Sequence, residues 1–424
     1  NWKKAHNVLL PNFSMAAMNR YHPMMIDIAR QMTDKWSRLN PGESISVSDE
    51  MTRLTLDTIG LCGFDYRFNS FYRERPHPFI RAMTRALGTA MDRTNRLGIL
   101  DRFQFVENTR FSAATKLIND TVDGIIQERR QNSDQLKGNS DLLSAMLTGT
   151  DRETGEGLDD LNIRYQIITF LIAGHETTSG LLSFTLYFLL NNPEVMKRAI
   201  EEVDRVLGRN VDADPTYRQV TELRYVRQVL HESLRLWPTA PMYALFPIEG
   251  ETTLGGRYQV NKRDGIAVLA PMLHRDPTVW GPNPEQFDPE HFSPEAERKR
   301  SPNVYKPFGN GQRACIGRQF AMHEATLAVG MILQRFSLES AEDYQLKVKE
   351  TLTLKPSGLR IKAIPRDHTP GPASVPAEAA TATTVATPAK EEQKRPVKLA
   401  AHGTPLQVLF GSNMGTAEGL AARI

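Results

Sequence analysis

The spacing of apolar residues predicts a chain built mainly from helices. Apolar side chains recur every three or four positions through the first 135 residues, and no strand-rich block interrupts them. Ser48 and Asp49 offer polar caps at the start of the second of these segments. The expected helices cover residues 15–39, 48–62, 78–92, 111–130, 162–191, 220–236 and 319–336, and a further helix starts at residue 141.

Residues 165–190 are the most apolar long run of the chain, within a predicted helix that is apolar nearly all round. A helix without a polar face is buried on every side, so we expect it to run through the middle of a large domain. His175 and Glu176 stand at its centre. Ionisable groups at that depth favour a helix buried in protein over a helix that crosses a membrane.

Short strands and then a change of composition follow towards the C-terminus. Alternating and β-branched patterns, with turns at Gly255-Gly256 and at residues 355–358, predict short strands. These strands are expected within residues 253–260, 264–273 and 344–364. Residues 366–404 are rich in Pro, Ala, Thr, Glu and Lys and contain no aromatic residue, which is typical of an extended, disordered linker.

Composition sets broad limits on the kind of protein. With 424 residues, 40% of them hydrophobic, the chain can bury a large core in one big domain or in more than one. Its net charge of +3 gives no reason to expect a nucleic-acid partner. Cys62 and Cys315 are too few for a disulfide framework, which suits a cytoplasmic location, and Cys62 is expected in the core. The chain starts without Met and stops inside an unfinished helix, so we expect both ends to be cut.

Cys315 stands in a glycine-rich segment directly before a predicted helix. Gly309, Gly311 and Gly317 permit positive φ and close backbone approach, so amide N–H groups can turn towards the sulfur. The positive N-terminus of the helix points the same way, and together these features favour a thiolate. The alternative for a single cysteine is an inert buried thiol.

The spacing Phe308-x-x-Gly311-x-Arg313-x-Cys315-x-Gly317 resembles the haem-binding signature of the cytochrome P-450 monooxygenases. The resemblance implies a P-450 fold, mainly α with minor β, and haem b whose iron is held axially by the cysteine. It also implies a set of residues that contact the haem. They are Trp2, His6, Ala173, Gly174, Phe308, Gly309, Arg313, Cys315 and Gly317.

Trp2 and His6 are four residues apart, which is one turn of a helix. Taken alone, such a pair is usually placed at the surface. The resemblance implies that Trp2 hydrogen-bonds a haem propionate. His6 stands where many members of the family carry an arginine for the same purpose.

The centre of the long helix reads Ala173-Gly174-His175-Glu176-Thr177-Thr178. Gly174 leaves room for a flat ligand against the helix, and Thr177 can divert backbone bonding and open the turn. A Ser/Thr cluster with satisfied hydrogen bonds is the alternative. The segment is similar to the oxygen-activating segment of the same family, which implies that Thr177 holds the bound dioxygen and a water while Glu176 gates the proton supply.

Glu232 and Arg235 would form an ordinary surface pair on most helices. Here they resemble the Glu-x-x-Arg pair of the family, a buried structural brace behind the haem loop. His291 stands where many members have a third arginine, so we expect the network to be short of one charge. By the same resemblance, apolar residues at three positions face the substrate cavity: Ala240, Pro241 and Leu352.

Residues 405–410 are predicted to form a buried strand that leads through a glycine- and hydroxyl-rich loop into a helix. Such a loop can cradle a phosphate with backbone N–H groups. It resembles the FMN phosphate loop of flavodoxin-like domains, in which the contacts would come from Ser412, Asn413, Thr416 and Ala417. Only the start of that domain is present, so this piece cannot fold as a domain.

The order of these parts resembles the self-sufficient fatty-acid hydroxylases of the Bacillus megaterium flavocytochrome type, in which a P-450 and its diflavin reductase share one chain. The resemblance implies a haem domain over residues 1–365, a linker over 366–404 and the start of an FMN domain over 405–424. It implies hydroxylation of fatty acids near the ω end with O2 and with electrons passed from NADPH through FAD and FMN. It is also compatible with a homodimer of the full-length protein.

The resemblance further implies that the N-terminal part of the haem domain precedes Asn1. We therefore expect the chain as given not to turn over NADPH and to bind haem poorly. A peroxide-using haem-thiolate hydroxylase, a haem gas sensor and a non-catalytic helical binding module are the competing classes. Glu176 and Thr177 and the flavin-type loop argue against a peroxide user, which needs no threonine gate.

Overall fold

The computed structural model describes residues 2–94, 105–132, 141–247, 250–350 and 353–367. The chain divides into two units, Asn1–His368 and Thr369–Ile424. Leu352, nearly all of the predicted linker and the predicted FMN loop lie outside the described residues. Arg366 belongs to the first unit, because its guanidinium bonds to Asp204 and to the Leu333 carbonyl.

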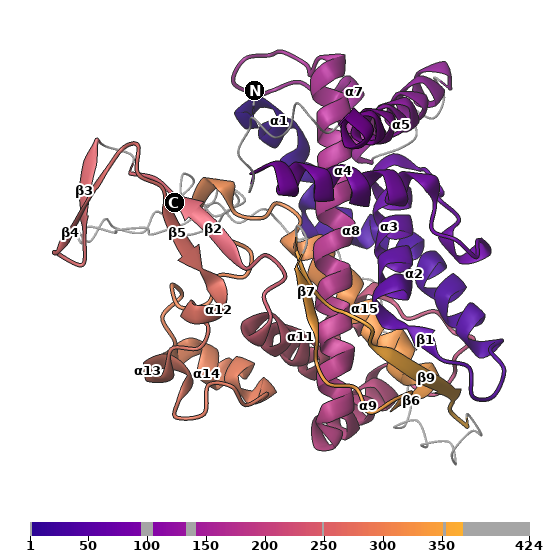
Figure 1. Ribbon diagram of the computed structural model, residues 1–424. Helices are drawn as coiled ribbons and strands as arrows, with labels where there is room; N and C mark the ends of the chain where they lie inside the picture. Colours follow the sequence, from indigo (N-terminus) through magenta and orange to yellow (C-terminus); the bar gives the residue numbers. More distant parts are fainter. Residues whose placement is uncertain (1, 95–104, 133–140, 248–249, 351–352, 368–424) are drawn as a thin grey trace, which may run out of the picture. The chain divides into compact units, whose positions relative to one another are not determined.

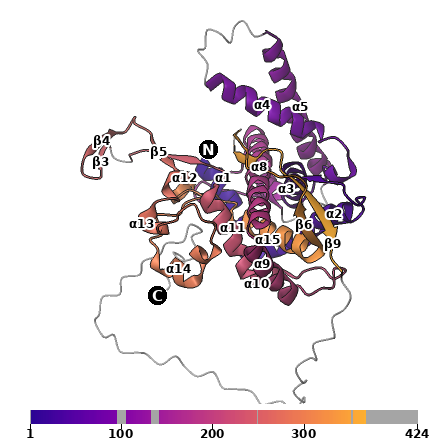
Figure 2. The same cartoon turned by 60° about the horizontal axis from the view of Figure 1, so that its bottom comes forward.

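The described part of the chain is mainly helical with small sheets, which confirms the predicted fold class (Figure 1). Its helices up to residue 191 are α1 (Trp2–Leu9), α2 (Met15–Ser37), α3 (Val47–Phe64), α4 (Pro78–Thr94), α5 (Phe105–Gln131), α7 (Leu142–Thr148) and α8 (Asp160–Asn191). The later helices are α9 (Pro193–Val206), α10 (Tyr217–Glu222), α11 (Arg224–Leu236), α12 (Ala270–Leu273), α13 (Pro277–Trp280), α14 (Pro294–Lys299) and α15 (Arg318–Arg335). Figure 2 shows α4 and α5 side by side.

The strands form four antiparallel sheets within the described residues. β1 (Ile45–Ser46), β9 (Arg360–Pro365) and β6 (Phe336–Ser340) make one sheet in that order. The two-stranded sheets are β2 (Met242–Leu245) with β5 (Ile266–Leu269), β3 (Glu251–Leu254) with β4 (Tyr258–Asn261), and β7 (Val348–Glu350) with β8 (Leu354–Pro356). The β3–β4 hairpin stands apart from the helices of the first unit (Figures 1 and 2).

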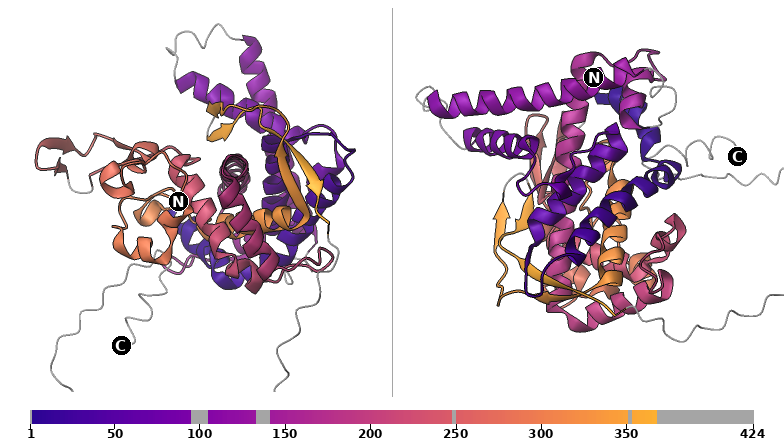
Figure 3. Two further views of the ribbon diagram at one scale, coloured as in Figure 1. Left: turned by 90° about the horizontal axis from the view of Figure 1, so that it is seen from below. Right: turned by 90° about the vertical axis from the view of Figure 1, so that its right-hand side faces the viewer.

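α8 runs through the middle of the first unit, as its all-round apolar sequence predicts. Figure 3 shows it end-on with the other elements around it. It begins at the Asp159 cap, whose carboxylate accepts the Asn162 N–H. Among the described elements, it packs most extensively against α3. None of the helices in the described ranges combines the length and the apolar character that a membrane crossing needs.

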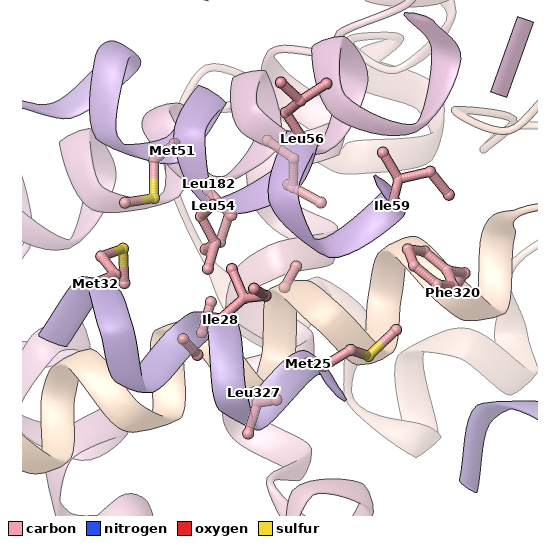
Figure 4. Close-up of a cluster of buried hydrophobic side chains, with 14 of the residues drawn as sticks. Met25, Ile28, Met32, Met51, Leu54, Leu56, Ile59, Leu182, Phe320 and Leu327 are labelled. Atoms are coloured by element: carbon pink, nitrogen blue, oxygen red, sulfur yellow. The ribbon is translucent and has the colours of Figure 1, made fainter. Parts of the chain in front are cut away.

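The core at this centre is built by α2, α3, α8 and α15 (Figure 4). Met25 and Ile28 of α2 interleave with Leu54 of α3 and Leu327 of α15, and each of these side chains is at most 2% exposed. Burying one such side chain contributes about 1.5–3 kcal/mol. Cys62 is fully buried in the same core, which confirms its predicted place.

The predicted single helix over residues 220–236 is wrong, because the chain forms two helices there. α10 starts with a capping box between Thr216 and Gln219. Leu223 then leaves the helical region with φ −74° and ψ 68°. The buried Glu202 carboxylate of α9 accepts the N–H groups of Tyr225 and Val226, which starts α11 anew.

Two predictions about strands also need correction. The strand expected over residues 264–273 ends at Leu269, because Pro271 opens α12. The turn at residues 355–358 does not join two paired strands. β8 pairs with β7, whereas β9 pairs with β6 and β1, which are far from it in sequence.

The start of α3 also differs from the prediction. Ser46 occupies the N-cap position and Val47 is the first helical residue. The Ser48 hydroxyl instead donates to the Pro356 carbonyl at 2.7 Å. It therefore ties α3 to β8 rather than capping the helix.

Candidate functional site

Cys315 lies on the loop between a short 3₁₀ helix, Gly311–Arg313, and α15. Backbone hydrogen bonds fix this loop internally. The Cys315 N–H donates to the Phe308 carbonyl at 2.8 Å, and the Gly309 N–H donates to the Lys306 carbonyl at 3.1 Å. The cysteine is therefore held on a constrained turn.

The glycines of the loop divide into two kinds. Gly309 and Gly311 have φ of +73° and +68°, a region that other residues rarely adopt, as predicted. Gly317 has φ −85° and is the N-cap of α15, so its predicted positive φ is wrong.

The Cys315 side chain is exposed on one side of the loop and crowded by protein on the others. Burial raises the pKa of its thiol, while a backbone hydrogen bond from Gly317 and the charge of Arg318 oppose that rise without cancelling it. The prediction that the loop alone favours a thiolate is therefore wrong. A metal ion at the sulfur would be needed to remove the proton.

α1 places Trp2 and His6 beside the Cys315 loop. The Arg313 guanidinium lies 3.8 Å from the centre of the Trp2 ring, and the Trp2 and His6 rings are 4.9 Å apart. Burial and the charge of Arg313 lower the pKa of His6, so it is neutral at pH 7. The guanidinium, the indole N–H and the imidazole N–H together provide donors suited to carboxylate groups.

Aromatic side chains link the Cys315 loop to α8. A Cβ built on Gly317 would lie 3.9 Å from the Cys315 Sγ and 3.9 Å from the Phe13 ring. Phe13 in turn stacks on Phe170 of α8, with ring centroids 5.6 Å apart. Phe13 therefore lies between the Cys315 loop and Phe170, which is one turn before Ala173 on α8.

Ala173 and Thr177 share one face of α8, and Ala173 is exposed while Thr177 is half-buried. The Thr177 hydroxyl donates to the Ala173 carbonyl at 2.8 Å. α8 continues unbroken through this point, so the predicted opening of the turn is wrong. The hydroxyl shares the carbonyl with the helical ladder instead of replacing it.

Gly174 faces α3 rather than open space. A Cβ at this position would lie 2.9 Å from Ile59 Cγ1 and 3.3 Å from two further atoms of the same side chain. The prediction that a flat ligand lies against Gly174 is therefore wrong. The missing side chain instead lets α3 and α8 approach each other closely.

Glu176 is held in a half-buried ion pair. Its Oε2 lies 2.8 Å from Lys355 Nζ of β8 and accepts the Thr353 hydroxyl at 3.3 Å, and its Oε1 lies 3.1 Å from His175 Nε2. Burial alone would raise the pKa of Glu176, but the His175 hydrogen bond and the Lys355 charge hold that pKa well below its usual range. The carboxylate is therefore ionised. Glu176 and Lys355 also line a polar cavity of about 860 Å³ that α3, α4 and the β7–β8 hairpin border.

Glu232 and Arg235 form a fully buried pair on α11. Two hydrogen bonds of 2.7 and 2.8 Å join them, and both side chains are 0% exposed. The guanidinium also donates to the carbonyls of His274, Pro284 and Gln286. Burial opposes ionisation of Glu232, yet the hydrogen bonds from Arg235, His291 and the Asp288 backbone, together with the charge of Arg235, outweigh it and lower the pKa of the carboxyl.

His291 takes part in this network as a neighbour of Glu232. Its Nδ1 lies 3.2 Å from Glu232 Oε1, and the Asp288 backbone N–H donates to the same oxygen at 2.9 Å. Arg300 lies 4.4 Å from the centre of the Trp280 ring and donates to the His291 carbonyl. Arg300 thus brings a positive charge within electrostatic range of Glu232 and contacts the network through the His291 carbonyl.

Ala240 and Pro241 precede β2, with Ala240 exposed and Pro241 half-buried. Their role in a substrate cavity stays a prediction.

The structure also reveals two connecting residues that the sequence did not indicate, Lys355 and His274. Lys355 is far from Glu176 in sequence, and His274 sits in no motif, so periodicity carried no signal for either.

The chain matches the family model for cytochrome P450 over residues 1–363. It is 55% identical over 425 residues to the bifunctional cytochrome P450/NADPH–P450 reductase of Bacillus cereus. It is 54% identical over 428 residues to the bifunctional cytochrome P450/NADPH–P450 reductase 1 of Bacillus subtilis. It is 40% identical over 434 residues to a self-sufficient cytochrome P450 monooxygenase of Phanerodontia chrysosporium. These alignments cover the whole of this chain but only 39–40% of each relative. This chain belongs to the cytochrome P450 family.

Proposed function

We propose that this protein is a haem-thiolate monooxygenase that hydroxylates fatty acids near the ω end. It uses O2 and electrons that a fused reductase containing FAD and FMN passes on from NADPH. The haem part follows from the P450 family, and the reductase part is supported by relatives that are named as P450/NADPH–P450 reductase fusions. The fatty-acid substrate comes from the sequence resemblance alone.

The observation that carries the proposal is the accessible Cys315 thiol on a constrained loop beside a cluster of donors. The sulfur would bind the haem iron, and Arg313 and Trp2 would donate to the haem propionates with His6 as a third donor. Iron held through sulfur supplies the activation of O2, because the thiolate pushes electron density that favours O–O cleavage.

Thr177 would hold a proton beside the reacting oxygen. Its hydroxyl bonds the Ala173 carbonyl, and rotation about χ1 can redirect the O–H without breaking α8. The exposed Ala173, rather than Gly174, would lie against the flat face of the haem.

Glu176 would pass protons towards Thr177 from the side of the polar cavity. Because it is ionised and held by Lys355, it must leave that ion pair before it can deliver a proton. Resting Glu176 is thus an acceptor, and water in the cavity of about 860 Å³ is its source of protons.

The remaining parts of the proposal concern the complete protein. Ala240, Pro241 and Leu352 would border the acyl chain. Ser412, Asn413, Thr416 and Ala417 would contact the FMN phosphate. A cytoplasmic location and a homodimer also belong to the proposal.

The full-length protein provides the test. Reduced with CO, the wild type should absorb at about 450 nm, as expected for thiolate-ligated haem, and Cys315→His should lose that band. A panel of fatty acids with NADPH should then give products hydroxylated near the ω end. Retention of the band in Cys315→His, or turnover that needs peroxide and not NADPH, would refute the proposal.

A further inference from the structure

His274 lies between the buried Glu232–Arg235 pair and the start of the Cys315 loop. Its backbone carbonyl accepts a hydrogen bond from Arg235 Nη1 at 3.0 Å, and its ring Nε2 accepts the Lys306 backbone N–H at 3.0 Å. The residue is 0% exposed. One buried residue therefore contacts the ion pair through its backbone carbonyl and the loop through its side chain.

The hydrogen bond from the Lys306 N–H to His274 can set the position of the loop. Its N–H donates to His274, and its carbonyl accepts the Gly309 N–H at 3.1 Å, so both of its backbone groups are fixed. Two residues later, the Phe308 carbonyl accepts the Cys315 N–H at 2.8 Å. A shift of Lys306 would therefore be passed to the cysteine through short backbone bonds.

The His274 ring can make this contact in one form only. To accept from an N–H group, Nε2 must carry its lone pair, so the ring proton is on Nδ1. Burial, with the charges of Arg235 and Arg275, lowers the pKa of His274 to about 4 against backbone hydrogen bonds that raise it. The ring is therefore neutral at pH 7, and it packs against Tyr305 with centroids 5.0 Å apart.

We propose that His274 is a positioning residue for the iron ligand. By accepting the Lys306 N–H, it transmits the fixed position of the Glu232–Arg235 pair to the Cys315 loop and keeps the sulfur where it can bind haem iron. This role rests on the proposed haem-thiolate function. His274 touches none of the reacting atoms.

The test uses the full-length, haem-loaded protein and three variants. His274→Leu removes the acceptor at similar volume, and His274→Gln places an amide oxygen where Nε2 was. The control, His22→Leu, removes another buried ring, which bonds His323 and the Pro215 carbonyl instead. The readouts are the hydrogen-exchange rate of the Lys306 amide and the fraction of CO-bound haem that absorbs at about 450 nm.

In His274→Leu we expect exchange at Lys306 to become about five- to tenfold faster, which corresponds to one net hydrogen bond. The fraction at about 450 nm should fall by half or more. His274→Gln should restore both readouts, and His22→Leu should change neither. If His274→Leu yields no folded protein, His274→Asn replaces it, because its shorter side chain cannot reach Lys306.

Three results would overturn the proposal: wild-type exchange and spectrum in His274→Leu, failure of His274→Gln to restore them, or an equal loss in His22→Leu. If His274→Asn is used in place of His274→Leu, the same hydrogen-exchange rate of the Lys306 amide in His274→Asn and His274→Gln would also overturn the proposal. A wild type without the band at about 450 nm would instead refute the haem-thiolate function, and the exchange rate would still report on His274.

Discussion

Substitution of Gly174 by alanine separates its two interpretations, a seat for a flat ligand and a contact between helices. Alanine in place of glycine inside α8 gains about 1 kcal/mol of helix propensity. The new Cβ, however, would lie 2.9 Å from Ile59 Cγ1. Overpacking of this kind costs about 1–3 kcal/mol, so we expect Gly174→Ala to destabilise the domain by about 1 kcal/mol.

Truncation of the neighbour should reverse the sign of this effect. Ile59→Ala alone should cost about 2–5 kcal/mol, because it leaves a cavity between α3 and α8. In that background, Gly174→Ala meets no clash and keeps its propensity gain, so it should stabilise by about 1 kcal/mol. The coupling between the two sites is then about 2 kcal/mol.

The assay is a thermal melt of the four full-length proteins of this cycle, followed by haem absorbance. Gly174→Ala should lower the Tm by about 2 °C in the wild-type background and raise it by a similar amount in Ile59→Ala. The same small loss in both backgrounds would refute the packing argument. A shifted Soret band in Gly174→Ala that is independent of Ile59 would restore the ligand interpretation.

Three further predictions follow from the site. Glu232→Gln strands the buried charge of Arg235, so it should cost about 3–5 kcal/mol and reduce the yield of haem-loaded protein. Lys355→Met removes the charge and the hydrogen bond of Lys355 at Glu176, so it should raise the pKa of that carboxyl. In the wild type, the lowered pKa of Glu176 contributes stability that is present above the pKa of the unfolded state and is lost as pH falls, so the Tm of the variant should decrease less on acidification than that of the wild type. Thr177→Ala should lower product formed per NADPH about tenfold or more, with little change in Tm.

Each of these predictions has a matched control. Glu222→Gln breaks the exposed Arg218–Glu222 pair, which should matter by less than about 0.5 kcal/mol, and an equal loss there would contradict the buried-brace argument. Adding Glu176→Gln to Lys355→Met should remove the part of the pH dependence of Tm that Glu176 still contributes. Thr177→Ser keeps the hydroxyl and should keep coupling, so tight coupling in Thr177→Ala would count against the assigned role.

Local sequence patterns were sufficient to predict most helices, because their apolar faces and caps lie within the segment itself. The break between α10 and α11 could not be found this way. It depends on Glu202, whose carboxylate reaches from α9 to two backbone N–H groups. The chain around Leu223 carries a continuous amphipathic pattern, so no local feature marks the break.

The sequence was sufficient to predict which residues belong to the site, but it only partly predicted which neighbours their side chains face. Helical geometry alone places Ala173 and Thr177 on one face and Glu176 on another. What Glu176 then meets depends on Lys355 of β8, a contact between segments far apart in the chain. Gly174 was equally ambiguous, because a small residue in a buried helix serves a ligand and a neighbouring helix alike, and only Ile59 decides between them.

The connection from the Glu232–Arg235 pair on α11 to the Cys315 loop explains a feature of the sequence analysis. The spacing of the motifs was more informative about the site than the identities of the residues between them. Arg235 donates to three carbonyls, and the loop receives the link through the backbone N–H of Lys306. Backbone groups are present whatever the residue, so such bonds leave no trace in composition. Such bonds require only that the backbone follows the same path, and the number of residues between the motifs sets that path. His274 differs, because its ring is the side chain through which this path reaches the loop, and substitution there tests the connection directly.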